Sequence, residues 1–352
     1  MVVYTCGNCN KEFKQKGHYT RHTQNKTPCK KPIPILHEKK FTAVDLFSGA
    51  GGMTQGFVDA GVNVVFGVEF DKYAAMTYRA NFSHPLYCED IEKIDDVKLR
   101  EQYGPVDIVF GGPSCQGFSM AGKRDIKDPR NSLFMSYLRF VKTFSPKYFV
   151  MENVPGILTM KTATGELVID IIKAETQKLG YNLKWKKLIA SDYGVPQIRK
   201  RIIFLGWKEG ENEPNHPDPI PEKVVMSDIL LPREEVDLKY YHSQKMIDGF
   251  NRRAIKNKAA GKGFGAQFIS LEKPCYTISA RYYKDGSDAL VKYSETEIRK
   301  LTEKEAARVQ SFPDSFIFPV PVVQIYKQIG NAVPCKLAYH FATSLLKAFK
   351  EI

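Results

Sequence analysis

Short apolar runs separated by polar segments set the pattern of the chain between residues 43 and 205. Runs of this length that are rich in valine, isoleucine and phenylalanine are typical of buried strands in a parallel sheet. Helices are predicted by amphipathic stretches and by Thr302 and Glu305, which have the spacing of a capping box. The pattern therefore predicts an α/β protein, with strands at 43–47, 64–68, 106–110, 148–151 and 202–205 and helices that begin near Met53, span 132–144 and 301–308, and follow Pro334.

A cysteine stands in a tight loop directly after the third predicted strand. The loop, residues 111–119, reads GGPSCQGFS, and its glycines, proline and small residues end the apolar run abruptly. In open α/β sheets, ligands bind at the carboxyl ends of the strands, so the thiol of Cys115 is placed to react with one. Taken alone, Cys115 is better explained as a small buried side chain, as most free cysteines are, and the rest of the chain shifts the balance toward a reactive thiol.

A glycine-rich turn, SGAGG at 48–52, follows the first predicted strand. Glycines at such a turn let a ligand approach the backbone, and the amides at the start of the next helix face it. Glu69 ends the next strand, where an acidic side chain accepts hydrogen bonds from ribose hydroxyls. Phe70 is predicted to stack on an adenine, and Asp90 and Ile91 to close the far side of the same site. These residues predict a βαβ unit that binds an adenosine; a sheet of this type without a ligand is the alternative.

Charged residues lie beside two further predicted strands. Glu152 follows strand 148–151, and burial against a sheet raises a carboxyl group's affinity for a proton, so that it can act as an acid. Arg199 and Arg201 precede strand 202–205, and the alternation of a strand places them on one face. Two fixed guanidinium groups there are suited to grip a base carbonyl and to orient Glu152. A solvated strand end and surface salt bridges are the alternatives.

The chain is strongly basic, with 52 Lys and Arg against 39 Asp and Glu and a formal net charge of +13. The excess is concentrated in residues 1–40 and 239–284. A polyanionic partner such as DNA or RNA explains two basic windows better than solubility alone. In the second window aromatic residues are interspersed with basic ones, and Arg252, Arg253 and Lys256 are predicted to contact phosphates. A solvated lysine-rich surface is the alternative.

Residues 1–30 carry the spacing of a metal-binding module. The first two cysteines are separated by two residues, twelve residues separate the second from a histidine, and aromatic residues occupy the positions of a small core. Four ligands on zinc would supply the folding energy that so short a segment lacks. The segment resembles a ββα zinc finger in which a cysteine replaces the last histidine, with Cys6, Cys9, His22 and Cys29 as ligands and His18 as the competing fourth ligand. Residues 31–41, with paired lysines and two prolines, are predicted to be a linker.

The sequence shows no sign of export or of membrane insertion. The N-terminus lacks the charged and then apolar pattern of a signal peptide, and no stretch is apolar over a membrane-spanning length. Seven cysteines, three of them in the metal-like cluster, favour a reducing compartment without disulfide bonds. We therefore expect a soluble, intracellular monomer of the cytoplasm or nucleoid.

Six segments resemble, in order, the motifs of the cytosine-C5 DNA methyltransferases: DLFSGAGG, GGPSCQGFS, MENVPG, QIRKR, LTEKEAARVQSFPDSF and QIGNAVP. They extend from about Thr42 to the C-terminus. The resemblance implies a Rossmann-like S-adenosylmethionine-dependent methyltransferase domain at 42–206 and 299–352, with a smaller target recognition domain at 207–298. Double-stranded DNA is the implied partner. The residues that would surround the cofactor are Phe47, Gly49, Gly51, Glu69, Phe70, Asp90, Ile91 and Asn331.

The resemblance also assigns catalytic roles. Cys115 would attack C6 of a cytosine that is flipped out of the DNA, Glu152 would donate a proton to N3, and Arg201 would hold the exocyclic oxygen, with Arg199 in support. The attack adds electron density at C5, which takes the methyl group from the sulfonium, and loss of the C5 proton expels the thiol. The implied DNA contacts near the extruded base are Gln116, Ser119, Thr277 and Ile278.

Two features depart from the family. Ser114 stands where a second proline is usual before the cysteine, and the zinc finger is an addition that the catalytic family does not require. Cys275-Tyr276-Thr277 nearly matches a triplet typical of the family's RNA branch, so a tRNA cytosine-C5 methyltransferase is the nearest alternative. A catalytically inactive DNA-binding protein is the second alternative, but four intact catalytic residues argue against it.

Overall fold

The structure is a computed structural model, and it describes residues 4–5, 12–13, 15–23, 41–113, 132–162, 164–261, 266–284 and 287–349. The chain divides into two compact units, Met1–Lys40 and Phe41–Ile352. Several predicted site residues lie outside the described ranges: Cys6, Cys9, Cys29, Cys115, Gln116 and Ser119.

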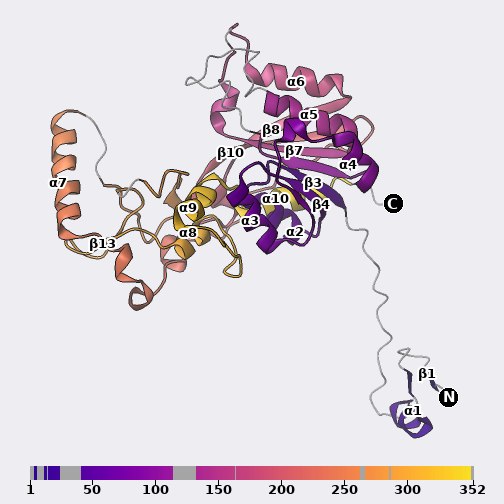
Figure 1. Ribbon diagram of the computed structural model, residues 1–352, viewed down its shortest axis with the longest axis horizontal. Coiled ribbons are helices and arrows are strands. Elements are labelled where there is room, and N and C mark those ends of the chain that lie inside the picture. The colour runs from indigo at the N-terminus through magenta and orange to yellow at the C-terminus, as the bar shows by residue number, and fades with distance from the viewer. Residues whose placement is uncertain are drawn as a thin grey trace. The chain divides into compact units, whose positions relative to one another are not determined.

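A seven-stranded sheet forms the centre of the larger unit, in the order β5-β4-β3-β6-β7-β10-β8 (Figure 1). Its strands are β3 (Thr42–Leu46), β4 (Asn63–Val68), β5 (Leu86–Tyr87), β6 (Ile108–Gly111), β7 (Tyr148–Asn153), β8 (Tyr181–Ile189) and β10 (Lys200–Lys208). Neighbouring strands from β5 to β7 run parallel, whereas β10 runs antiparallel to both β7 and β8. All five apolar runs are strands, as predicted, but the sheet is mixed because the last of these runs lies in β10.

Helices cover both faces of this sheet. The helices on one face are α2 (Gly52–Asp59) and α10 (Cys335–Leu346), and those on the other are α4 (Asp96–Tyr103), α5 (Ser132–Phe144) and α6 (Val168–Lys178). Phe57 of α2 and Phe341 of α10 belong to one hydrophobic core. A Cβ on Gly56 would lie 2.4 Å from the Cβ of Ala338, so glycine is what allows these two helices to approach so closely. The C-terminal helix therefore packs on the sheet.

The order of the parallel strands reverses at β3, because β4 lies on one side of it and β6 on the other. In open α/β sheets the carboxyl ends of the strands at such a point form a crevice for ligands. Gly111 ends β6 beside β3, and a Cβ on it would lie 2.1 Å from the carbonyl oxygen of Leu46. The glycine turn and the cysteine loop therefore start from two strand ends that touch.

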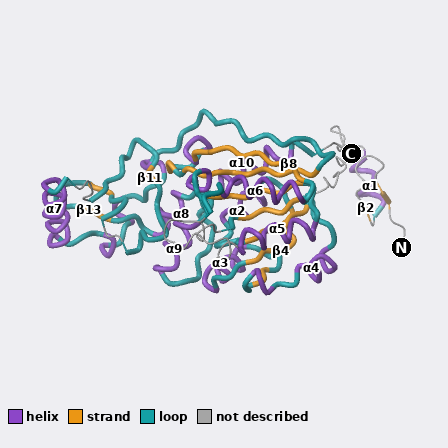
Figure 2. Tube along the Cα trace, turned by 90° about the horizontal axis from the view of Figure 1, so that it is seen from above, coloured by secondary structure: helices purple, strands orange, loops and turns teal. Residues whose placement is uncertain are grey.

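The remaining elements of the larger unit pack around a third hydrophobic core and two smaller ones, one with residues of α3 and one with residues of α7. They are α3 (Lys72–Asn81), β9 (Gln197–Ile198), α7 (Gln244–Ala259), β11 (Cys275–Tyr276), β12 (Val291–Lys292), β13 (Ile298–Arg299), α8 (Glu303–Val309) and α9 (Val322–Asn331). Short 3₁₀ helices lie at Ile91–Lys93, Pro155–Leu158, Ala190–Tyr193, Met226–Asp228, Arg233–Glu235 and Leu238–Tyr240. The third core joins Met226 and Ile278 to Val309 of α8 and Ile329 of α9. Residues 207–298 thus share their packing with the C-terminal helices, while α7 lies at the far end of the unit from α4 in both views (Figure 2).

The described part of the smaller unit has the order ββα. β1 (Tyr4–Thr5) pairs antiparallel with β2 (Glu12–Phe13), and α1 spans Lys16–Thr23. The rings of Tyr4 and Phe13 both contact the ring of Tyr19, and the ring centroids of Phe13 and His22 are 4.9 Å apart. No group of three or more potential metal ligands occurs within the described residues, and three of the four predicted zinc ligands lie outside them.

Candidate active site

Glu69 joins the segments that follow β3 and β4. One of its carboxylate oxygens accepts a hydrogen bond from the Gly49 amide at 2.7 Å, and the other accepts one from the Asp71 amide at 2.6 Å. Gly49 adopts the left-handed conformation, with a φ of +56°. Burial is the largest influence on Glu69 and raises its pKa. The carboxylate predicted to bind a ribose is therefore held in place by the glycine turn.

The three glycines of the turn have different surroundings. A Cβ on Gly49 would meet no atom within 4 Å, so this position faces open space. A Cβ on Gly51 would lie 2.3 Å from the ring of Phe82, and one on Gly52 would lie 2.4 Å from the carbonyl oxygen of Val333. Gly51 and Gly52 therefore serve the packing of the turn, and Gly49 and Gly52 border the space that a ligand would occupy.

A pocket of about 270 Å³ opens beside Glu69. Phe70 is 75% exposed, so its ring is available to a ligand. The Asp90 side chain accepts a hydrogen bond from the Glu92 amide and so begins the short helix Ile91–Lys93. Five of the residues predicted to bind an adenosine line this one pocket: Phe47, Glu69, Phe70, Asp90 and Ile91.

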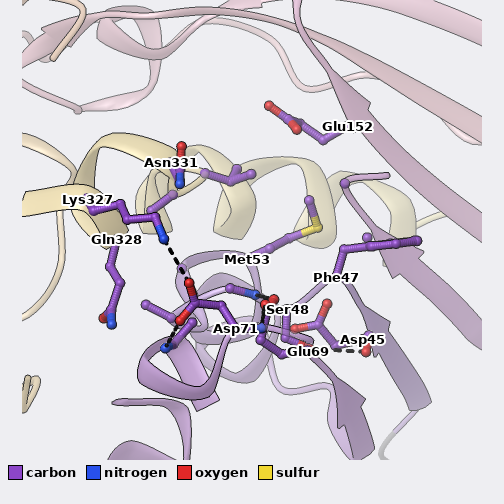
Figure 3. A pocket seen from close by; sticks show the side chains of 18 residues that line it. Asp45, Phe47, Ser48, Met53, Glu69, Asp71, Glu152, Lys327, Gln328 and Asn331 are labelled. Carbon is purple, nitrogen blue, oxygen red and sulfur yellow. Dashed lines mark hydrogen bonds and ion pairs between the residues drawn. The ribbon is translucent and has the colours of Figure 1, made fainter. Parts of the chain in front are cut away.

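A second cavity, of about 390 Å³, extends from Glu69 to Glu152 (Figure 3). Asp45 and Asp71 also line it, so that four carboxyl groups face this space. Lys327 of α9 places its Nζ 2.8 Å from Oδ2 of Asp71. Burial by itself raises the pKa of Asp71, but hydrogen bonds from Lys327 and from the amides of α3 outweigh burial and lower it.

The carboxyl end of α9 supplies two amide side chains to the second cavity, Gln328 and Asn331. Asn331 is one of the residues that the family resemblance implied, whereas sequence reasoning missed Gln328. Gln328 is only 6% exposed, and both polar atoms of its side chain lack a hydrogen-bond partner among the described residues. Because an unpaired buried amide is costly, this position fits a cavity that receives a polar ligand.

Sequence reasoning also missed Asp45, which lies within β3 and is 1% exposed. The hydroxyl of Thr54 of α2 is hydrogen-bonded to its carboxyl group. Burial raises the pKa of Asp45 to about 8, and the negative charge of Glu69 contributes in the same direction. The available signal was a carboxyl group inside an otherwise apolar strand.

Glu152 and Arg201 form an ion pair where the second cavity meets a third one, of about 500 Å³. The distance from Arg201 Nε to Glu152 Oε1 is 2.5 Å, and the two side chains are 12% and 13% exposed. The strands bring them together because β10 pairs antiparallel with β7. A Cβ on Gly112 would lie 3.0 Å from Glu152 Oε2, so the loop after β6 passes close to this carboxylate.

Arg199 is buried and lines the third cavity, as Arg201 does. It lies between β9 and β10, is 2% exposed, and donates hydrogen bonds to the carbonyl oxygens of Ile278 at 3.2 Å and Gly330 at 2.9 Å. Burial, followed by the charge of Arg201, lowers the pKa of Arg199 to about 9. Both arginines therefore line the cavity that Glu152 borders: Arg201 pairs with Glu152, and Arg199 connects residues 275–280 to the end of α9.

The third cavity brings together residues that are far apart in sequence. Thr277 lines it together with Pro113, Arg199, Arg201 and Asn331. The hydroxyl of Thr277 donates to the carbonyl of Ile198 at 3.0 Å. Ile278, which was predicted to contact DNA with Thr277, is fully buried in the third hydrophobic core, so its side chain does not reach the surface.

The predicted phosphate contacts Arg252, Arg253 and Lys256 lie on α7 and are exposed. None of the three lines the cavities described above. Within the part of the chain that the structure describes, no helix is long and apolar enough to cross a bilayer.

Comparison with known proteins places this chain in a family. Residues 41–347 match the C-5 cytosine-specific DNA methylases. The chain is 39% identical over 310 residues to the Type II methyltransferase M.SsoII of Shigella sonnei, which covers 86% of this chain and 79% of that protein. It is 40% identical over 297 residues to the Type II methyltransferase M.NlaX of Neisseria lactamica, covering 83% of this chain and 92% of that protein.

A solved structure with the same fold is that of the S. pombe Dnmt2 methyltransferase. Its TM-score is 0.71 at 20% sequence identity, over 88% of this chain and 99% of that one. This likeness supports the fold alone, an α/β methyltransferase with a mixed central sheet.

Proposed function

This chain belongs to the C-5 cytosine-specific DNA methylase family and is a DNA cytosine-5-methyltransferase, and on that premise we propose which of its residues perform the transfer. The ion pair between Glu152 and Arg201 carries the proposal, because it stands where the two larger cavities meet. We assign the 500 Å³ cavity to the flipped cytosine and the other two to S-adenosylmethionine.

In this proposal Cys115 is the nucleophile. Pro113, two residues before it, lines the cavity assigned to the cytosine. The thiolate of Cys115 forms a bond to C6, and Glu152 gives a proton to N3, so that the electron pair of the C5–C6 bond becomes available at C5. Arg201 pairs with the carboxyl group of Glu152 and would also hold the exocyclic oxygen of the base. After methylation, solvent water takes the C5 proton, the electron pair of that C–H bond re-forms the C5–C6 double bond and expels the thiolate, and N3 returns its proton to Glu152.

The cosubstrate is proposed to lie along the glycine turn. S-Adenosylmethionine supplies the methyl group as part of a sulfonium ion. Phe70 and Ile91 would hold the adenine, Glu69 the ribose hydroxyls, and Asn331 with the unpaired amide of Gln328 the polar end of the amino-acid part. Gly49 leaves the space beside the turn open for it.

In this proposal Arg199 does not contact the base and acts on it indirectly. Its hydrogen bonds to Ile278 and Gly330 fix the backbone beside Thr277, which lines the cytosine cavity. We further propose that residues 207–298 recognise the DNA, with Arg252, Arg253 and Lys256 of α7 on the phosphates, while 42–206 and 299–352 carry the chemistry. The exposed position of α7 supports this division. The contacts of Gln116 and Ser119 and the monomeric state remain predictions.

Labelled S-adenosylmethionine, supplied with either duplex DNA or tRNA, tests the substrate assignment. We expect label on the DNA alone; label on tRNA alone would establish the RNA alternative.

Cys115→Ala should bind duplex DNA with unchanged affinity and form no covalent adduct with DNA that contains 5-fluorocytosine. An adduct that survives in this variant would exclude Cys115 as the nucleophile. Duplex binding by the native chain without methylation would support the inactive binding protein.

Residues 1–30 are proposed to bind one zinc ion through Cys6, Cys9, His22 and Cys29. The antiparallel β1–β2 pair, α1 and the contact between Phe13 and His22 support a finger of this kind. Zinc would replace the hydrophobic core that so short a segment cannot build. Metal analysis of the full chain should give one zinc, which Cys9→Ser removes. Loss of zinc in His18→Ala but not in Cys29→Ala would transfer the fourth ligand to His18.

A further inference from the structure

Asp45 is a buried carboxyl group in the cavity assigned to the cosubstrate. It is 1% exposed, and its partners are the hydroxyl groups of Thr54 and Ser48. The ionisable groups that act on it come from three other elements: Glu69 after β4, Tyr78 of α3 and Tyr137 of α5. Within the described residues, no lysine or arginine forms an ion pair with Asp45.

The other carboxyl groups of the cavity have fixed partners. Asp71 pairs with Lys327, Glu152 pairs with Arg201, and Glu69 accepts two backbone hydrogen bonds. Asp45 has only neutral partners, and burial raises its pKa to about 8. In the unliganded protein at neutral pH it therefore holds a proton, and its ionisation responds to any charge that enters the cavity.

A chain of hydrogen bonds leads from Asp45 to a partly exposed histidine. Thr54 Oγ1 is 3.1 Å from Tyr78 Oη, which is 2.7 Å from His84 Nε2. Burial lowers the pKa of His84 to about 4, so its ring is neutral and can either donate or accept. With Asp45 protonated, each hydroxyl donates toward His84; with Asp45 ionised, each donates toward the carboxylate. These hydrogen bonds therefore satisfy both ionisation states of Asp45, because every donor and acceptor along them can exchange roles.

We propose that Asp45 distinguishes the cosubstrate from the product by losing its proton when the positively charged sulfonium binds and regaining a proton when the neutral thioether is left. This inference rests on the proposed function of the cavity. The two ligands share their adenosine and their amino-acid group, and they differ by one methyl group and one positive charge. The proton of Asp45 passes to solvent along Thr54, Tyr78 and His84, and one proton from solvent restores the acid after methyl transfer.

The expected discrimination follows from linkage between ligand and proton binding. The proposal places the sulfonium within about 4 to 6 Å of Asp45, where an opposite charge lowers the pKa of a carboxyl group by about 1 to 3 units, and each unit is a factor of ten in affinity. The native protein should therefore bind S-adenosylmethionine at least about tenfold more tightly than S-adenosylhomocysteine above pH 8. The preference should decline as the pH falls below 8, because ionising Asp45 then opposes binding.

Calorimetry of the full chain at pH 7, in two buffers that differ in ionisation enthalpy, tests this directly. We expect release of about 0.4 to 0.9 of a proton when S-adenosylmethionine binds, for a pKa lowered by about 1 to 3 units, and of almost none when S-adenosylhomocysteine binds. Asp45→Asn should abolish the difference in proton release and reduce the preference about tenfold. Thr54→Val should keep the release but move its pH dependence upward, because the donor to the ionised form is lost. Asp59 is an exposed carboxyl group on the same helix as Thr54, and Asp59→Asn should change neither the proton release nor the preference between the two ligands.

Equal proton release with both ligands in the native protein, or an Asp45→Asn variant with unchanged proton release, would overturn the inference. The comparison in the native protein needs no variant, so misfolding of Asp45→Asn leaves it decisive. Failure of the native protein to bind either ligand would instead contradict the proposed function of the cavity.

Discussion

Gly112 and Glu152 lie against each other across the mouth of the cosubstrate cavity: a Cβ on Gly112 would lie 3.0 Å from Oε2 of Glu152. The other oxygen of the same carboxylate is 2.5 Å from Arg201 Nε. Glu152 is thus confined between a backbone and a guanidinium group. The position of the proposed proton donor depends on the absence of a single methyl group from the neighbouring loop.

Gly112→Ala is therefore expected to reduce kcat with little effect on folding. The added methyl group displaces the carboxylate by a few tenths of an ångström or more, and misplacement of a catalytic group by about 1 Å costs roughly a hundredfold in rate. Gly156→Ala is the matched control, because a Cβ there meets nothing within 4 Å. Steady-state methylation of a cytosine-containing duplex measures both. Equal activity in the two variants would show that Glu152 tolerates the shift.

Phe70→Ala should raise the KM for S-adenosylmethionine by about tenfold, because a stacked aromatic ring contributes about 0.5 to 1.5 kcal/mol beyond the area that it buries. The ring is 75% exposed without a ligand, so the Tm of the unliganded protein should not change. Leu238→Ala, at a residue that is 83% exposed and outside the pocket, serves as the control. A fall in the Tm with an unchanged KM would assign Phe70 to folding.

The buried Asp45 predicts a pH dependence of stability. Its pKa is about 8 in the folded chain, against a usual value of 3.8, so the folded state holds one more proton than the unfolded state between these values. This contribution to stability is complete below about pH 4 and declines as the pH rises toward 8. Asp45→Asn carries no such proton. The free energy of unfolding of this variant, minus that of the native protein, should therefore increase from pH 5.5 to 8.5. Urea denaturation across this range measures it, and a constant difference would contradict the raised pKa.

The exposed basic residues of α7, Arg252, Arg253 and Lys256, predict DNA binding that depends on salt concentration. Removing one phosphate-binding side chain should reduce the slope of log Kobs against log salt by about 0.9. Replacing Arg252 and Arg253 by glutamine should flatten the slope without changing which sequence is methylated. Lys98→Gln, on α4 at the opposite end of the unit, should leave the slope unchanged. A slope that is equal in all three proteins would place the phosphates on another surface.

Much of the fold follows from local pattern. The five apolar runs are strands, and the Thr302–Glu305 spacing is a capping box in which each residue's side chain binds the other's amide. Such features depend on neighbours within a few residues, so the sequence displays them directly. Antiparallel β10 and the edge strand β8 were not predicted, because strand direction and pairing depend on contacts between distant segments.

The residue types of the site and the loops that carry them could be read from the motifs, since Glu69, Phe70, Asp90, Glu152 and Arg201 all lie beside cavities as implied. How each side chain is used could be seen only in the folded chain. Arg199 turns to the carbonyl oxygens of Ile278 and Gly330, and Asp45 faces a cavity in which its described partners are neutral. Hydrogen bonding and the ionisation of a buried group are set by the atoms that surround it, and those atoms come from parts of the chain far away in sequence.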